Sequence, residues 1–198
     1  MPDFRALVEQ ALQALEQERP ADAEKAIRTA LGISPRDDQL LHLLGVALVR
    51  QQREEEAIEP LQKAISLNRR DAEYHNALGC ALRNSGRYSE GLESFSRALR
   101  LEPGLQDAHY NLAQTYQRMG EFSKAEEKFR FIQSRNPGDV EVIGALSMLR
   151  WFTGDHEGAL GELRAGIEAH PGSGDMRFLL GDQLLALGRS DSALSTAV

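Results

Sequence analysis

Cysteine is almost absent from this chain, which contains only Cys80 among its 198 residues. A single cysteine excludes an intramolecular disulfide framework and fits a reducing cytoplasm, although it leaves an intermolecular bridge open. Long apolar runs are absent too, since stretches such as Leu184 to Leu187 fall far short of the roughly 20 residues that span a bilayer. No apolar segment typical of a secretory signal follows Met1. We therefore expect a cytoplasmic protein that does not insert into a membrane.

Positive charge is scarce, with 23 Lys and Arg residues against 30 Asp and Glu residues and a net charge of −7. This balance argues against nucleic acid as a partner, because phosphate recognition depends on clustered cations. Apolar residues (41%) and charged residues (27%) occur at the frequencies of folded rather than disordered proteins. The chain should therefore fold.

Prolines and small residues recur with a period of 34 residues. Pro35, Pro103, Pro137 and Pro171 are separated by multiples of 34, and Arg69 occupies the missing place. Two further series keep the same register: Ala23, Ala57, Gly91, Ala125, Ala159 and Ala193, and Gly86, Gly120, Gly154 and Gly188. Three series with one period indicate a repeat protein. Counted from Phe4, residues 1–198 form a single array of repeats 4–37, 38–71, 72–105, 106–139, 140–173 and the incomplete 174–198.

Each repeat has the pattern of two helices. In repeat 3, apolar residues lie at helical spacing before Gly86 and again between Gly91 and Pro103. Gly86 accepts the left-handed conformation of a helix C-terminus, and Pro103 prevents the second helix from continuing. Position 8, counted from the start of each repeat, carries small residues such as Gly79, which let the paired helices approach closely.

The pattern resembles the tetratricopeptide repeat, in which Leu-Gly, a Tyr-like residue, an alanine, an aromatic residue and a terminal proline recur. Repeat 4 matches best, with Leu112, Ala113, Tyr116, Gly120, Ala125, Phe129 and Pro137. The resemblance implies an all-α fold, an α-solenoid of antiparallel helix pairs forming a right-handed superhelix whose first helices line a concave groove. Glu18 departs from the glycine series, and Pro60 lies within the second helix of repeat 2, where we expect a local kink.

Candidate catalytic and metal-binding groups are few. The glycines have neither Walker nor Rossmann spacing, and no nucleophile elbow occurs. His75 and His109 both occupy position 4, where the resembled family has a packing aromatic residue, so we expect them to pack rather than to bind a metal or relay protons. The sequence predicts a protein that is not an enzyme and has no catalytic residue, metal or cofactor.

The resemblance places partner-binding residues at positions 5, 6, 9, 12 and 13 of the first helices. These are Asn76, Cys80, Arg83 and Asn84 in repeat 3, Tyr110, Asn111, Gln114, Gln117 and Arg118 in repeat 4, and Met148, Trp151, Phe178 and Asp182 in repeats 5 and 6. Amides both donate and accept hydrogen bonds, so they can hold the backbone of an extended peptide. The apolar group of repeats 5 and 6 is suited to anchoring a partner's side chain. The alternative for Trp151 and Phe178 is packing against neighbouring helices.

Position 2 carries a carboxylate in four successive repeats, at Glu73, Asp107, Glu141 and Asp175. A first-turn carboxylate stabilises its own helix by about 0.3–1 kcal/mol through the helix dipole, which accounts for all four. A negative rail that steers a basic peptide is the alternative. Position 5 carries no lysine, which argues against the clamp that related repeats use for chaperone C-termini.

These patterns predict a noncatalytic interaction scaffold that holds a peptide or protein segment of unknown identity in its groove. The alternatives are the N-terminal substrate-recruiting arm of a larger bacterial enzyme, of glycosyltransferase, sulfotransferase or methyltransferase type, and a self-assembling structural module. Because repeat 6 stops within its second helix, we expect 174–198 to be the least protected segment. Its end surface for weak self-association would be Leu184, Leu185, Leu187 and Leu194.

Overall fold

The computed structural model describes residues 3–189, and this part of the chain contains eleven α-helices and no β-strand. The helices are α1 (Phe4–Glu16), α2 (Pro20–Ile33), α3 (Asp38–Arg50), α4 (Glu54–Leu67), α5 (Ala72–Asn84), α6 (Tyr88–Leu101), α7 (Gln106–Arg118), α8 (Phe122–Arg135), α9 (Val140–Phe152), α10 (His156–Ala169) and α11 (Gly174–Ala186). Every first helix starts at the first residue of its repeat. The predicted all-α repeat solenoid is confirmed.

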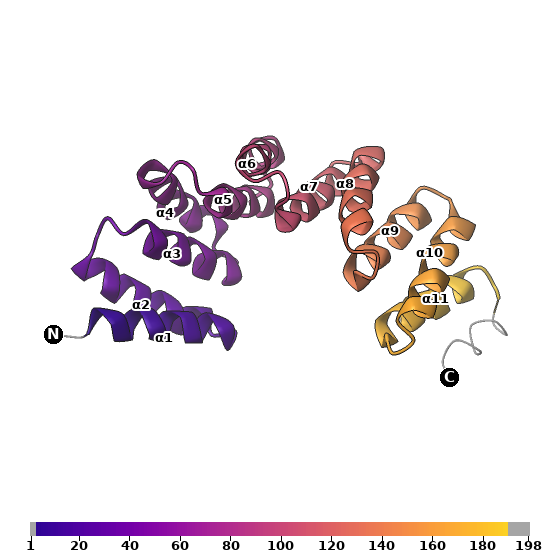
Figure 1. Ribbon diagram of the computed structural model, residues 1–198, viewed down its shortest axis with the longest axis horizontal. Helices are drawn as coiled ribbons and strands as arrows, with labels where there is room; N and C mark the ends of the chain where they lie inside the picture. Colours follow the sequence, from indigo (N-terminus) through magenta and orange to yellow (C-terminus); the bar gives the residue numbers. More distant parts are fainter. Residues whose placement is uncertain (1–2, 190–198) are drawn as a thin grey trace. The chain divides into compact units, whose positions relative to one another are not determined.

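The chain divides into two compact units, Met1–Asn111 and Leu112–Val198, and the boundary falls within α7. In the N-terminal unit each helix from α1 to α6 packs against the next, and α3 also contacts α5 (Figure 1). In the C-terminal unit α8 to α11 pack in succession, and α9 also contacts α11. The first helices α3 and α5 therefore adjoin each other in the N-terminal unit, and α9 and α11 do so in the C-terminal unit. The single array and the right-handed superhelix stay predictions, and Ala193 and Leu194 lie outside the described residues.

Side-chain caps set the start of most first helices. At α5, the Asp71 carboxylate accepts a hydrogen bond from the backbone N–H of Glu73 at 3.0 Å. Such a cap contributes typically about 1 kcal/mol to helix stability. The capping residues are Asp3, Asp37, Asp71, Asp139 and Ser173. These capping positions also recur with the 34-residue period. They form a further periodic series in the sequence, beyond the three series that define the repeat.

The turn inside each helix pair needs a left-handed residue. Gly86, Gly120, Gly154 and Gly188 adopt φ between 72° and 88°. At the same place Glu18 and Gln52 have φ of 54° and 59°, a conformation that costs a residue with a Cβ roughly 1–2 kcal/mol. The first two repeats therefore keep the turn geometry without the residue type that adopts it most easily.

Close packing within the pairs depends on the small residue at position 8. A Cβ atom at Gly79 would lie 2.5 Å from the ring of Phe95 on α6, and one at Gly45 would lie 2.4 Å from Leu61 on α4. Phe95 and Leu61 are fully buried. Although Pro60 lies inside α4, that helix continues from Glu54 to Leu67, so the proline does not end it.

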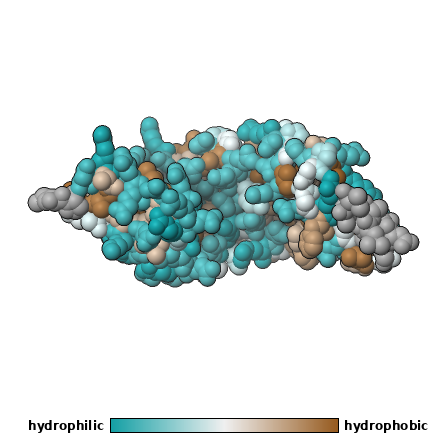
Figure 2. Space-filling model, turned by 90° about the horizontal axis from the view of Figure 1, so that it is seen from below, coloured by the Kyte–Doolittle hydropathy of each residue, from teal (hydrophilic) through white to brown (hydrophobic). Residues whose placement is uncertain are grey.

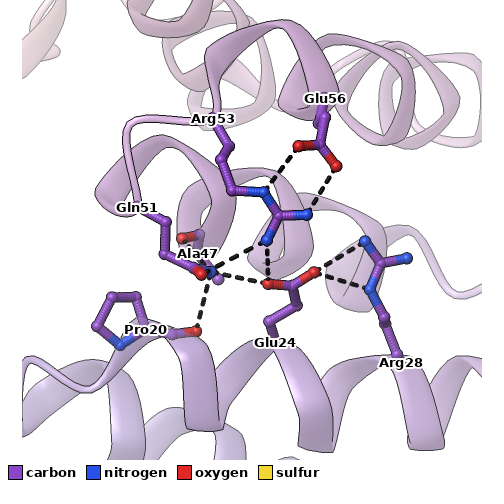
Figure 3. A network of polar contacts seen from close by, with 7 residues as sticks. All are labelled: Pro20, Glu24, Arg28, Ala47, Gln51, Arg53 and Glu56. Atoms are coloured by element: carbon purple, nitrogen blue, oxygen red, sulfur yellow. Dashed lines mark hydrogen bonds and ion pairs between the residues drawn. The ribbon is translucent and has the colours of Figure 1, made fainter.

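A polar network joins repeat 1 to repeat 2 on the side of α2 (Figure 3). The Glu24 carboxylate accepts hydrogen bonds from Arg28 (2.9 Å), Gln51 (2.9 Å) and Arg53 (2.6 Å). Arg53 also pairs with Glu56 at 2.7 Å. Burial alone would raise the pKa of Glu24, but the hydrogen bonds from Gln51, Arg28 and Arg53 lower it below its ordinary value. The network therefore connects α2 to the turn between α3 and α4.

Candidate functional site

The N-terminal unit contains a cavity of about 490 Å³ along three successive first helices. Its lining residues are His42, Val46, Val49 and Arg50 from α3, Glu73, Asn76, Ala77 and Cys80 from α5, and Asp107, Tyr110 and Asn111 from α7. Val46, Val49 and Ala77 give it an apolar wall, while the amides and carboxylates give it a polar one. The structure thus brings together predicted residues of repeats 3 and 4, and it adds the α3 residues that the amide pattern did not reveal.

A chain of hydrogen bonds links α5 to α7 through two of the lining residues, Asn76 and Asn111. Arg83 Nη1 donates to Asn111 Oδ1 at 2.9 Å, and Asn111 Nδ2 donates to Asn76 Oδ1 at 3.0 Å. Arg83 Nε also donates to Asn84 Oδ1 at 3.1 Å. The expectation that packing does not use these positions is wrong for Asn76, whose residue is only 7% exposed. Its amide is committed to holding adjacent repeats together, because a buried polar group requires a partner.

Negative charge gathers at one end of the cavity. Burial raises the pKa of Glu73, and the charge of Asp107 raises it further, while a hydrogen bond with Asn76 acts in the opposite direction. Both carboxylates have exposed side chains. Burial lowers the pKa of His42 and raises that of Cys80, which keeps both groups neutral near pH 7. Only the Glu73 and Asp107 pair of the predicted rail faces this cavity.

A second cavity of about 440 Å³ continues toward α1. It shares His42 and Glu73 with the first cavity and is also lined by Phe4, Val8 and Asp71. Tyr74 borders it as well, and its hydroxyl donates to Asp38 at 3.0 Å. The residues of α1, α3 and α5 that line the two cavities, together with the capping residues before α3 and α5, therefore include both carboxylates and apolar side chains.

The predicted residues of the C-terminal unit behave differently from one another. Phe178 is 79% exposed and Met148 is 41% exposed, so neither is a core residue. Trp151 is half-buried, and its ring centroid lies 4.4 Å from that of His156 on the neighbouring helix α10, while its role in binding stays a prediction. On α7, Gln114 and Gln117 are half-buried and Arg118 is exposed. Figure 2 shows hydrophobic atoms at the surface of the C-terminal helices among mostly hydrophilic ones.

The position-4 histidines pack at helix starts, as predicted, and they also make polar contacts. His109 is 7% exposed, and its Nε2 donates to the Pro103 carbonyl at 3.0 Å. His75 Nε2 lies 3.4 Å from the Arg69 carbonyl in the equivalent geometry. Among residues 3–189, no group of three or more His, Cys, Asp or Glu side chains could hold a metal ion.

The leucines proposed for the C-terminal end surface differ in burial. Leu184 is buried in a core cluster with Leu160 and Leu180, so its inclusion in an exposed surface was wrong. Leu185 is exposed and Leu187 is half-buried. Self-association through this end stays a prediction. Within the described residues, no helix is long and apolar enough to cross a bilayer.

Comparisons with solved structures give the same fold. PilW, a widely conserved type IV pilus biogenesis factor, is 19% identical with a TM-score of 0.84, over 98% of this chain and 90% of that chain. Pseudomonas aeruginosa PilF is 20% identical with a TM-score of 0.78, over 98% of this chain and 88% of its own. An O-GlcNAc transferase of Thermobaculum terrenum is 26% identical with a TM-score of 0.62, over 67% of this chain and 26% of the enzyme.

Sequence comparison identifies the family. No curated protein matches the chain significantly. Models of the tetratricopeptide repeat, however, match residues 14–79, 82–149 and 145–198. These ranges include nearly all of the helices described above. The chain therefore belongs to the tetratricopeptide repeat family.

Proposed function

We propose that the chain is a noncatalytic scaffold whose first helices bind an extended peptide or a protein segment. The cavity along α3, α5 and α7 carries this proposal, because concave sites with an apolar wall and a few polar groups are typical of ligand binding. Val46 and Val49 would contact apolar side chains of the segment. Tyr110 offers an aromatic surface with a polar end, a combination common at binding hot spots.

The sequence favoured amides that hold the backbone of a bound peptide, whereas in this proposal the amides mainly hold two helices together. Asn76 and Asn111 are bonded to each other, so they position α5 against α7 and leave only part of their capacity for a partner. Recognition is then shared between the exposed carboxylates, Tyr110 and the apolar wall. Phe178 and Met148 are exposed apolar side chains of the C-terminal unit and are further candidates for contact with a partner.

Site-specific photo-crosslinking tests the location of binding. A photoreactive amino acid is placed at Val46 or Tyr110, which line the cavity, and at Gln62 or Glu93, which are exposed on the second helices α4 and α6. The four labelled proteins are irradiated in an extract of the source cells. We expect a common crosslinked protein at Val46 and Tyr110 and none at the two controls. Crosslinks confined to Gln62 and Glu93 would contradict a groove-binding scaffold.

The second candidate function is a substrate-recruiting arm of a larger enzyme. The match to 26% of an O-GlcNAc transferase supports it, because repeats of this kind occur there within a longer catalytic chain. The coding sequence beyond Val198 distinguishes the two functions. A catalytic domain in the same reading frame would favour the recruiting arm, and an immediate stop codon would favour the independent scaffold.

The cytoplasmic location and the protein nature of the partner belong to the same proposal. The single cysteine supports a reducing compartment. The net charge of −7 supports a protein partner over a nucleic acid. Cell fractionation with an epitope-tagged chain tests the location, and recovery in a periplasmic fraction would contradict it.

A further inference from the structure

We propose that the cavity of the N-terminal unit selects a peptide segment with a lysine or arginine, whose cationic group lies between Glu73 and Asp107. The inference rests on the proposed function, since it names the chemistry of the segment that the scaffold binds. It commits the position-2 carboxylates of repeats 3 and 4 to recognition, whereas the helix dipole alone explains those of repeats 5 and 6.

Charge complementarity is the first step. Glu73 and Asp107 occupy the same position of α5 and α7, and both line the cavity. Within residues 3–189 neither carboxylate forms an ion pair with the protein's own cations. The raised pKa of Glu73 reflects its burial and the proximity of Asp107. A cation between the two carboxylates would relieve this repulsion, so the site favours a positively charged group over a neutral one.

The arginines that line or border the cavity donate hydrogen bonds to neutral groups rather than to Glu73 or Asp107. Arg50 Nη1 donates to the Leu15 carbonyl at 2.7 Å. Arg83 donates to both Asn111 and Asn84. His42 is neutral because burial lowers its pKa. The negative end of the cavity is thus left for a charge supplied by the partner.

The apolar wall suits the rest of such a side chain. Lysine and arginine bury their aliphatic stems against apolar surface while the charged head stays near polar groups. Val46, Val49 and Ala77 supply that surface beside the carboxylates. The second cavity continues the acidic character with Asp37 and Asp71. A segment running from α7 toward α1 would therefore meet carboxylates at more than one of its residues.

The experiment uses a phage-displayed library of random dodecapeptides selected against the full chain. Selected peptides are synthesised with a fluorescent label, and their Kd is measured by anisotropy. The test variant is E73Q/D107N, and the matched control is E141Q/D175N, which changes the same position in repeats 5 and 6. These side chains are exposed, and circular dichroism verifies that both variants fold.

We expect the peptides to share a lysine or arginine at one place. E73Q/D107N should weaken binding about tenfold, as expected for two partly desolvated ion pairs, while E141Q/D175N should stay within about twofold. Replacing the shared cation with alanine should weaken binding of the wild type but have little effect on E73Q/D107N.

The two levels of the proposal fail in different ways. Peptides that crosslink at Tyr110 but lack a shared cation, or bind E73Q/D107N with unchanged Kd, would overturn the cation inference and leave the groove function standing. Peptides that crosslink only at Gln62 or Glu93 would overturn both.

Discussion

Gly79→Ala should destabilise the N-terminal unit although alanine is the better helix former. Gly79 lies in the middle of α5, where an added Cβ would come within 2.5, 2.6 and 2.8 Å of three carbons of the Phe95 ring. Phe95 is fully buried, so its ring has no free space to move into. The methyl group therefore forces α5 and α6 apart or the ring out of its rotamer.

The magnitude follows from two opposing effects. Overpacking a buried site costs typically about 1–3 kcal/mol, whereas replacing glycine by alanine within a helix contributes about 1 kcal/mol in the favourable direction. The net loss is then up to about 2 kcal/mol. Repeat 4 combines Ala113 with a fully buried Phe129 at the same two positions, so the pair itself can be accommodated when the helices adjust. This places the expected loss below the full overpacking cost.

Gly144→Ala is the matched control, because a Cβ built there on α9 meets no atom within 4 Å other than those of its chain neighbours and its own helix backbone. It should stabilise its helix by about 0.8–1 kcal/mol, giving the same substitution opposite signs at two sites. Urea unfolding followed by circular dichroism gives the overall change, and hydrogen exchange assigns it to α5 and α6 or to α9. Phe95→Leu in the Gly79→Ala background should cost less than the sum of the single changes. Stabilisation by Gly79→Ala, or strict additivity with Phe95→Leu, would refute the packing argument.

Three other substitutions, the last with Asn84→Ala as its control, have expected outcomes in unfolding experiments. Gln52→Gly should stabilise the chain by about 0.5–1 kcal/mol, because the native φ of 59° suits glycine better. Glu24→Gln should cost about 1 kcal/mol at pH 7. Since the folded-state pKa of Glu24 is lowered, its contribution is present above the unfolded value near 4.5 and is lost as pH falls through the folded pKa, so melting curves should converge in acid. Asn76→Ala should cost about 1–2 kcal/mol by leaving the buried amide contact of Asn111 unmade, while exposed Asn84→Ala should change stability by less than 0.5 kcal/mol.

Each of these expectations has a contrary result. Equal stability of the Gln52→Gly protein would show that the turn holds no strain. If Glu24→Gln still destabilised the protein in acid, the loss would come from side-chain packing rather than from the charge of the carboxylate. If Asn76→Ala left the free energy of unfolding unchanged, the amide of Asn76 would not be needed for packing.

The fold was predictable because its determinants recur in the sequence. A left-handed turn residue such as Gly86 and a close-packing residue such as Gly79 have counterparts 34 residues away, so each occurrence supports the others. The hydrogen bond between Asn76 and Asn111 has no such support. It joins position 5 of one repeat to position 6 of the next and depends on the separation of two helices, which residue spacing alone does not give. The packing of the Trp151 ring likewise depends on His156, a residue of the following helix, and residue spacing alone does not give this contact.

The residues that we propose for recognition differ in chemistry between the two units. Most positions that pack the helices are small or apolar, whereas the residues that line the cavities vary more from repeat to repeat. In the N-terminal unit they bring together Glu73, Asp107 and a bonded amide pair. In the C-terminal unit Met148 and Phe178 are exposed. A partner that used both units would thus need a cationic part for one and an apolar part for the other, so substitutions at Glu73 and at Phe178 should affect different residues of the same ligand.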